Sequence, residues 1–162
     1  MSGPTPPPPP YVRTARPDDR PFVVETAARL AEFGPPPWRT AEEVVEGEVR
    51  MLIAWFERPR PDAEILVAEA GNGERLGFAM MESPTDYFRR VQHGHVAILA
   101  VAANAQGRGA GGALLRAADA WSRARGFTWV TLNVFHGNTH AREVYAHAGY
   151  EPENLRYFKT LD

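Results

Sequence analysis

The chain has 162 residues, of which 44% are hydrophobic and 23% charged, so it has the length and composition of one globular domain and is not a disordered protein. Eighteen Lys and Arg against 20 Asp and Glu give a net charge of −2, which argues against a partner rich in phosphate such as nucleic acid. With no cysteine, no apolar run near the roughly 20 residues of a membrane span and no apolar core in the first ten residues, the sequence predicts a cytoplasmic protein without disulfides, secretion signal or membrane partner.

Residues 1–10 are rich in proline, and we expect a flexible tail of extended polyproline II ahead of one domain over residues 11–162. Glycines in Gly71-Asn72-Gly73 predict a hairpin, and a strand that is apolar on both faces predicts the centre of a mixed sheet with helices on its faces. In chain order, the residue patterns predict a strand over 11–16, a helix over 21–33, a helix capped by Thr40 and ended by Pro59, strands over 64–70, 75–82 and 95–101, a helix over 109–125, a strand over 127–135, a helix over 138–148 and a last strand over 155–161.

The segment between the central strand and the next helix holds four glycines in the six residues from Gly107 to Gly112. Glycines let the backbone turn tightly and bring its N–H groups close to a ligand. These amides come at the start of a helix, where unpaired donors and the positive end of the helix dipole favour an anion, above all a phosphate. Arg108 adds a positive charge, so the loop predicts a phosphate-binding site.

Two common phosphate-binding motifs do not fit this loop. Gly107, Gly109 and Gly112 match the dinucleotide pattern G-x-G-x-x-G, which requires an acidic residue about 20 positions later at the end of the next strand. The strand over 127–135 contains no acidic residue. A P-loop is excluded because no Gly-Lys-Ser/Thr follows the glycines.

Two blocks of the sequence resemble the GNAT family of N-acetyltransferases. Leu99-Ala100-Val101 followed by the run from Gln106 to Gly111 matches the family's strand and its Gln/Arg-x-x-Gly-x-Gly/Ala loop, and Asn138, Tyr145 and Gly149-Tyr150 match its second block. The resemblance covers residues 11–162. It implies an α/β (α+β) acyl-CoA N-acyltransferase fold, with a mixed, mostly antiparallel central sheet of about six to seven strands flanked by about four helices. The implied activity is transfer of the acetyl group of acetyl-CoA to a primary amine by direct attack, without a metal.

The resemblance also implies roles for particular residues. Asn138 would contact the pantetheine arm; its alternative role is that of a helix N-cap, and the two roles are compatible. Tyr145 would protonate the departing thiolate of coenzyme A, and the alternative is that it is a packed aromatic residue. The pantetheine arm would lie along the central strand almost as an added strand. The implied cofactor-binding residues are Leu99, Ala100 and Val101 for the pantetheine and Gln106, Gly107, Arg108, Gly109, Ala110, Gly111 and Gly112 for the pyrophosphate.

A protonated amine must lose a proton before it attacks a thioester, so the site requires a general base, and an oxyanion donor such as a strand amide near Leu99. The two carboxylates that relatives use fall here on Ala97 and Asn133. His95 remains a candidate because strand alternation places it on the face of Ala97, about 7 Å further out, at a distance that suits a base acting through water. Glu82, at the end of the neighbouring strand, is a second candidate if the two strands pair in a suitable register, and Asp86 in the following loop is a third.

The acceptor substrate is the part of the predicted reaction that the sequence determines least. The connection around Trp38 and the loop over 83–94 would wall the acceptor side, with Trp55, Tyr87 and Phe88 as further aromatic candidates, although core packing is the alternative for Trp55. A small amine, an amino acid or a peptide N-terminus fits a site without a dense acidic cluster. The resemblance makes a homodimer possible. A non-catalytic acyl-CoA sensor of the same fold is the competing hypothesis, because the two usual carboxylates are missing.

Overall fold

A computed structural model describes residues 3 and 5–162 of the chain; the remaining part of the predicted tail, residues 1, 2 and 4, lies outside the described residues. Residues 5–10 form neither helix nor strand. The elements, in chain order, are β1 (Tyr11–Thr14), η1 (Pro17–Asp19), α1 (Arg20–Ala27), η2 (Ala28–Ala31), α2 (Ala41–Glu57), β2 (Ala63–Glu69), β3 (Arg75–Glu82), β4 (Gly94–Val101), η3 (Ala103–Ala105), α3 (Ala110–Ala124), β5 (Val130–Leu132) and α4 (Thr139–His147).

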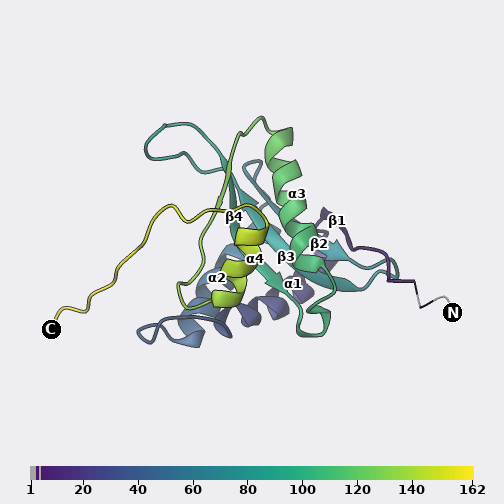
Figure 1. Cartoon of the computed structure of the whole chain (residues 1–162), viewed down its shortest axis with the longest axis horizontal. Coiled ribbons are helices and arrows are strands. Elements are labelled where there is room, and N and C mark those ends of the chain that lie inside the picture. The colour runs from purple at the N-terminus through teal and green to yellow at the C-terminus, as the bar shows by residue number, and fades with distance from the viewer. Residues whose placement is uncertain (1–2, 4) are drawn as a thin grey trace.

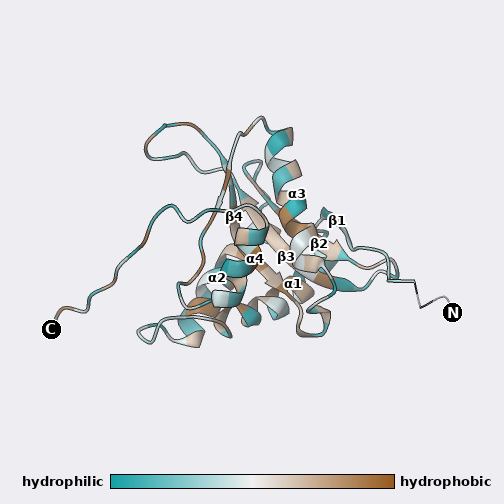
Figure 2. Ribbon diagram, in the orientation of Figure 1, coloured by the Kyte–Doolittle hydropathy of each residue, from teal (hydrophilic) through white to brown (hydrophobic). Residues whose placement is uncertain are grey.

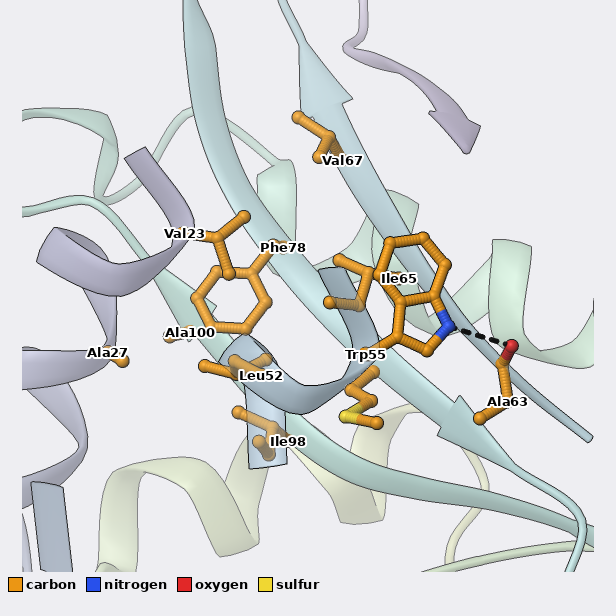
Figure 3. Packing of buried hydrophobic residues seen from close by; sticks show 11 residues of the cluster. Val23, Ala27, Leu52, Trp55, Ala63, Ile65, Val67, Phe78, Ile98 and Ala100 are labelled. Carbon is orange, nitrogen blue, oxygen red and sulfur yellow. Dashed lines mark hydrogen bonds between the residues drawn. The ribbon is translucent and has the colours of Figure 1, made fainter. Parts of the chain in front are cut away.

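One five-stranded sheet in the order β1-β2-β3-β4-β5 forms the centre of the molecule (Figure 1). The pairs from β1 to β4 are antiparallel, and β4 pairs with β5 in parallel. Alternate strand residues face two hydrophobic clusters. One lies against α1 and α2 and contains Phe78, Leu52 and Trp55, whose Nε1–H donates to the carbonyl of Ala63 at 3.0 Å (Figure 3). The other lies against α3 and contains Leu114 and Trp121.

Local signals in the sequence locate most elements correctly. Thr40 caps α2 with its hydroxyl on the amide of Glu43, whose carboxylate accepts from the Thr40 amide in return. Asn138 caps α4 by accepting the amide of Ala141 at 3.1 Å. The Gly71-Asn72-Gly73 hairpin joins β2 and β3, and β4 lies between β3 and β5 as its apolar pattern predicts. The mixed, mostly antiparallel sheet is therefore confirmed.

The number of strands is smaller than expected, with five in the described residues instead of six to seven. The strand predicted over 155–161 is wrong: this segment is irregular and exposed, and Figure 2 shows hydrophobic residues along it as well as inside the sheet. Alternation of apolar and polar residues produces a strand only where another strand offers an edge to pair with. The edge strand β5 has three residues instead of the nine expected over 127–135, so it offers little to pair with. Phe158 instead stacks on Trp38, with ring centres 4.9 Å apart.

The helix expected over 21–33 is also shorter than predicted. α1 ends at Ala27, and the chain continues to Ala31 as a 3-10 turn.

Within the described residues, no helix is both long and apolar enough to cross a membrane.

A buried carboxylate joins the start of the chain to the sheet. Asp19 is fully buried and accepts hydrogen bonds from Arg13 at 2.7 and 3.0 Å, from Nε of Arg75 and from the amide of Arg16. Burial alone would raise the pKa of Asp19, but these hydrogen bonds outweigh it and hold the pKa well below the usual value. The ionised carboxylate therefore stabilises the junction of β1, η1 and β3.

We expect Asp19→Asn to lower the free energy of unfolding by about 3–5 kcal/mol, because it removes the fully buried carboxylate that Arg13 and Arg75 share and leaves these part-buried guanidinium groups with only Glu69 and Asp18. The control is Asp18→Asn: Asp18 also pairs with Arg75, at 2.8 Å, but its side chain is 70% exposed, so its loss should cost under about 1 kcal/mol. Urea unfolding at pH 7 measures both. Since folding depresses the pKa of Asp19, its contribution is complete above the unfolded pKa and is lost as the pH falls below it. Equal losses in the two variants would contradict this account.

Candidate functional site

The site is organised around one edge of β4. On one side β4 pairs with β3 from Val101 back to His95, whereas on the other side its pairing with β5 covers only Gly94–Val96. The register with β3 shifts between Met80, which pairs with Ile98, and Met81, which pairs with Val96. A bulge therefore falls at Ala97, where β4 and β5 part. In the described chain, no strand pairs with the open side of residues 97–101, so their backbone groups on that side are available to a ligand.

One of these open backbone groups has a side-chain partner that the sequence did not indicate. Nε of Arg29, on η2, donates to the carbonyl of Val101 at 3.2 Å. The Arg29 guanidinium also pairs with Glu32 and lies 5.4 Å from the centre of the Phe33 ring. The carbonyl of Val101, at the C-terminal end of β4, therefore accepts a hydrogen bond from a side chain on the α1 side of the sheet.

The glycine-rich loop follows β4 after the short turn η3 and opens α3. Gly107 and Gly109 have φ of +74° and +80°, in the left-handed region that favours glycine, and Gly109 is the N-cap of α3. The amide of Ala113 makes the first intrahelical hydrogen bond, to the carbonyl of Gly109 at 3.0 Å. The amides before Ala113 are the first-turn donors that a helix leaves unpaired, so the start of α3 presents N–H groups to an anion.

Arg108 does not add its charge to those amides. Its guanidinium makes two hydrogen bonds to the carboxylate of Glu74, at 2.9 and 2.7 Å, across the β2–β3 hairpin. The predicted phosphate loop therefore depends on backbone donors, and Arg108 ties the loop to the sheet.

A cavity of about 500 Å³ lies between α3 and α4, next to the glycine-rich loop. Gly112, Leu115 and Arg116 line it from α3, and His140 and Val144 line it from α4. Tyr150, just beyond α4, also lines it. A ligand held at the start of α3 has room to extend along this cavity.

Tyr145 belongs to α4 and lies beside Tyr150, with ring centres 6.0 Å apart. Burial raises the pKa of the Tyr145 hydroxyl, so it keeps its proton at neutral pH. Burial also raises the pKa of Tyr150, to about 12, with help from the charges of Asp119 and Tyr145. Both tyrosine hydroxyls are therefore protonated at neutral pH.

The loop between η2 and α2 packs against the start of α4. Gly34 has φ of +75°, and a Cβ at this position would lie 2.3 Å from the amide nitrogen of Asn138. Only glycine permits this approach, which brings the predicted acceptor wall beside the cap of α4. Trp38, in the same connection, is half exposed and stacks on Phe158.

On the face covered by α1 and α2, the structure brings together two of the three base candidates. Glu82 and His95 are direct partners in the antiparallel pairing of β3 with β4. Nη2 of Arg60 donates to Glu82 at 3.0 Å. Burial lowers the pKa of His95, the charge of Glu82 raises it, His93 lowers it and a main-chain hydrogen bond with Thr131 raises it, with a net decrease. The imidazole is therefore neutral at neutral pH and chemically able to accept a proton.

The third candidate, Asp86, has a different role. Its carboxylate accepts the amides of Phe88 at 3.0 Å and Arg89 at 2.6 Å within its own loop, where Arg90 has φ of +58°. Tyr87 and Phe88 form an exposed edge-to-face pair in the same loop. Asp86 therefore stabilises its own loop. Trp55, the other residue with two interpretations, lies in the hydrophobic core, as the core-packing alternative predicted.

Sequence reasoning missed one carboxylate on this face. Glu48 of α2 is half buried; burial raises its pKa, and so does the charge of Glu82. This face of the sheet thus carries two carboxylates close enough to influence each other. Glu48 falls one helical turn before the buried Leu52, which indicates an inward face, but only the packing of α2 over β4 shows what it faces.

Comparisons with known proteins identify the family. The model of the acetyltransferase (GNAT) family matches residues 12–150. The chain is 32% identical over 145 residues to the "uncharacterized N-acetyltransferase YhfO" of Bacillus subtilis (strain 168), covering 88% of this chain and 90% of that protein. It is 35% identical over 101 residues to aminoglycoside N(6')-acetyltransferase type 1 of Klebsiella aerogenes, covering 60% of this chain and 66% of that protein.

The fold agrees with this assignment. A solved structure of a putative acetyl transferase from Pyrococcus furiosus superposes with a TM-score of 0.74 at 22% identity, over 94% of this chain and 99% of that one. The chain belongs to the GNAT family and has the acyl-CoA N-acyltransferase fold. It is an acyl-CoA-dependent acetyltransferase, as the two sequence blocks predict.

Proposed function

We propose that this protein transfers the acetyl group of acetyl-CoA to a primary amine of a small molecule, an amino acid or a peptide. The observation that carries the proposal is that an open β4 edge leads, after the one short turn η3, to a glycine-rich helix start, because together they offer strand-like backbone groups and a phosphate site to one extended ligand. The pyrophosphate would be bound by the amides from Gly107 to Gly112. The pantetheine arm would pair with Leu99, Ala100 and Val101, near Asn138.

The residues present fit this ligand. Three left-handed or helix-start glycines (Gly107, Gly109 and Gly112) carry no side chain that would block the amides, and the cavity of about 500 Å³ between α3 and α4 is adjacent to them. In the described residues, no group of three or more His, Cys, Asp or Glu side chains is placed to hold a metal ion. We propose acetyl-CoA as the acyl donor, which supplies the thioester that the amine attacks.

The acceptor amine would approach on the face that carries Glu48 and Glu82. Their two carboxylates favour a cation, and a primary amine arrives protonated at neutral pH. The Klebsiella aerogenes relative carries the name of an enzyme that acetylates an aminoglycoside amine, and its similarity supports a cationic acceptor for this chain. Exposed aromatic residues beside this face, among them Trp38, would contact the remainder of the acceptor.

His95 is the base that we propose. It lies beside Glu82, on the sheet face reached from α2, and the decreased pKa of its imidazole keeps it able to accept a proton at neutral pH. Tyr145 would donate its proton to the departing thiolate, and the amide near Leu99 would donate to the oxyanion. Glu82 would stabilise the imidazolium that forms when His95 accepts the proton.

A homodimer remains a prediction. The chain exposes 10867 Å², whereas a compact 18.0 kDa monomer exposes roughly 8,000 Å². Much of the apolar part of that surface lies on two segments that project from the body, the β3–β4 loop and the residues after α4 (Figure 1). These segments are where a second copy would pack. The exposed large hydrophobic residues on them are Tyr87, Phe88, Val91, Leu155, Tyr157, Phe158 and Leu161.

We expect Gly107→Ala to weaken the binding of acetyl-CoA about ten-fold or more. A side chain in the left-handed region costs about 1–2 kcal/mol, and relief of that strain turns the loop amides away from the pyrophosphate. Gly126→Ala is the matched control, because Gly126 has φ of +78°, against +74° for Gly107, and both have open space around a built Cβ. Calorimetry with acetyl-CoA should separate the two variants. Equal affinity of the two variants for acetyl-CoA would show that the loop is not part of the binding site.

Thiol release from acetyl-CoA in the presence of a panel of primary amines and peptides tests the activity itself. Transfer to at least one acceptor is expected, and binding of acetyl-CoA without turnover on any acceptor would favour the sensor of the same fold.

Tyr145→Phe should lower kcat by a factor of about 10²–10⁴, because it removes the proton donor for the thiolate.

The matched control for Tyr145 is Tyr150→Phe, which removes a neighbouring buried hydroxyl that has no hydrogen-bond partner in the described residues. This variant should keep its kcat within a factor of about two. A loss of similar size in both would assign Tyr145 to packing and not to proton transfer.

Replacement of the base should reduce turnover most at low pH, where little of the amine is already deprotonated. We expect His95→Ala to lower kcat/KM by a factor of about 10²–10⁴ with unchanged acetyl-CoA affinity, and Glu82→Gln to lower it less. In the unmodified enzyme the acidic limb of kcat/KM should fall below pH 6.5, the ordinary pKa of histidine, because the pKa of His95 is decreased and the basic form persists to lower pH. His136→Ala, on an exposed loop residue, is the control. Full activity in both the His95 and Glu82 variants would exclude them as bases.

A further inference from the structure

A single hydroxyl group bridges two histidine rings where β4 meets β5. Oγ1 of Thr131 lies 2.8 Å from Nδ1 of His95 and 3.0 Å from Nε2 of His93. The parallel register pairs His95 with Thr131 directly, so the backbone itself holds the hydroxyl against the imidazole. Neither Thr131 nor His93 has a role in the chemistry described above.

The ring of His93 is held in one orientation. The residue is 6% exposed, and its ring stacks on Trp129 with centres 5.5 Å apart and an angle of 15° between the planes. Its other nitrogen, Nδ1, is buried and has no hydrogen-bond partner in the described residues. Nε2 is therefore the ring atom through which His93 makes hydrogen bonds, and Thr131 is its partner.

The chemistry of a hydroxyl restricts how the two rings share it. A threonine has one hydrogen to donate and two lone pairs with which to accept. If Thr131 donates its hydrogen to Nε2 of His93, it can only accept from His95, and Nδ1 of His95 must then carry a hydrogen. In this arrangement Nδ1 of His93 carries a hydrogen that has no acceptor in the described residues. In the reverse arrangement Thr131 would donate to Nδ1 of His95, whose hydrogen would then lie on Nε2, and the ring would have no lone pair for a proton. The proposed role of His95 as base therefore requires that Thr131 donate to His93. In this arrangement the second nitrogen of His95, Nε2, has a free lone pair.

We propose that Thr131 and His93 are positioning residues that hold the neutral His95 ring with its hydrogen on Nδ1 and leave Nε2 free to accept a proton, relayed by a water molecule, from the acceptor amine. The inference rests on the proposed role of His95 as base. A base whose tautomer is fixed by a third group follows the same logic as the oriented histidine of hydrolytic triads, in which a wrong tautomer costs most of the activity. Here a threonine and a second histidine occupy the place that a carboxylate has there.

Nitrogen NMR of the histidine rings in the full chain tests the tautomer without any substrate. The spectrum at pH 7.5 should show His95 with a hydrogen on Nδ1 and none on Nε2. Thr131→Val keeps the branched shape that suits a strand but removes the hydroxyl, so the His95 signals should shift toward the other tautomer. Thr131→Ser keeps the hydroxyl and should restore the original pattern. His93→Phe keeps the stack on Trp129 but not the acceptor nitrogen, and it should shift His95 as Thr131→Val does.

Kinetics then connect the tautomer to turnover. Thr131→Val should lower kcat/KM roughly ten-fold or more and alter its acidic limb, whereas Thr131→Ser should retain most of the activity. The groups that bear on that limb are Glu82 from β3, His93 and Thr131. Glu82 in turn is bonded to Arg60 and feels the charge of Glu48 from α2. An Nε2–H tautomer in the unmodified chain, or equal losses of activity in the Val and Ser variants, would overturn the inference.

The failure of the proposed function has a different signature. If His95→Ala retains full activity, His95 is not the base, and positioning of its tautomer has no consequence for turnover. The NMR spectrum still decides, in that case, whether the hydrogen-bonded chain exists. Loss of activity in His95→Ala together with an unchanged spectrum in Thr131→Val would leave the proposed base intact and reject the positioning residues.

Discussion

The unequal pairing of β4 is the constraint on which the site depends. One side of the strand is bonded to β3 along nearly its whole length, which fixes its position, and the other side is bonded to β5 for only three residues. A strand held from one side only exposes backbone donors and acceptors without loss of its own order. Because the bulge at Ala97 coincides with the point where β5 departs, the change from paired to open edge is abrupt.

The glycine-rich loop extends this open edge. A chain that leaves β4 must turn to pack α3 on the sheet, and residues with positive φ at Gly107 and Gly109 make the turn short enough for the first amides of α3 to follow the strand closely. The bidentate pair between Arg108 and Glu74 then ties the turn to the hairpin of β2 and β3. Strand edge and helix start are therefore fixed relative to one another by the backbone, which a single extended ligand requires.

Residues whose role is local could be predicted from the sequence, and residues whose role depends on register could not. Thr40 and Asn138 cap helices through atoms three residues away, so their spacing alone reveals them. Glu82 was a candidate only under the condition that β3 and β4 pair in a suitable register, a condition that the structure fulfils. Glu48 and Thr131 come from separate elements, and no spacing within either element indicates that they approach β4.

The strand expected over 155–161 failed for a related reason. Alternation in a sequence describes the faces that a strand would have, but a strand also needs an edge to pair with, and this requirement is not local. β5 offers three residues, and Phe158 gains an aromatic contact with Trp38 instead. The same absence of a covering strand leaves the hydrophobic residues of this segment exposed, and they contribute, with the β3–β4 loop, to a surface larger than that of a compact monomer.

The two absent carboxylates, at Ala97 and Asn133, change where proton transfer can occur. With Ala97 in place of a longer side chain, the nearest base candidate on that face is His95, about 7 Å further along the strand, so a water molecule would have to connect it to the amine. That displacement moves the base to the end of the sheet where Glu82 and Glu48 lie. The amine would therefore meet the negative charge that attracts it and the ring that deprotonates it at one place. Under the proposed function, preference for a cationic acceptor and competence for catalysis would have a common structural origin, the pairing of Glu82 with His95.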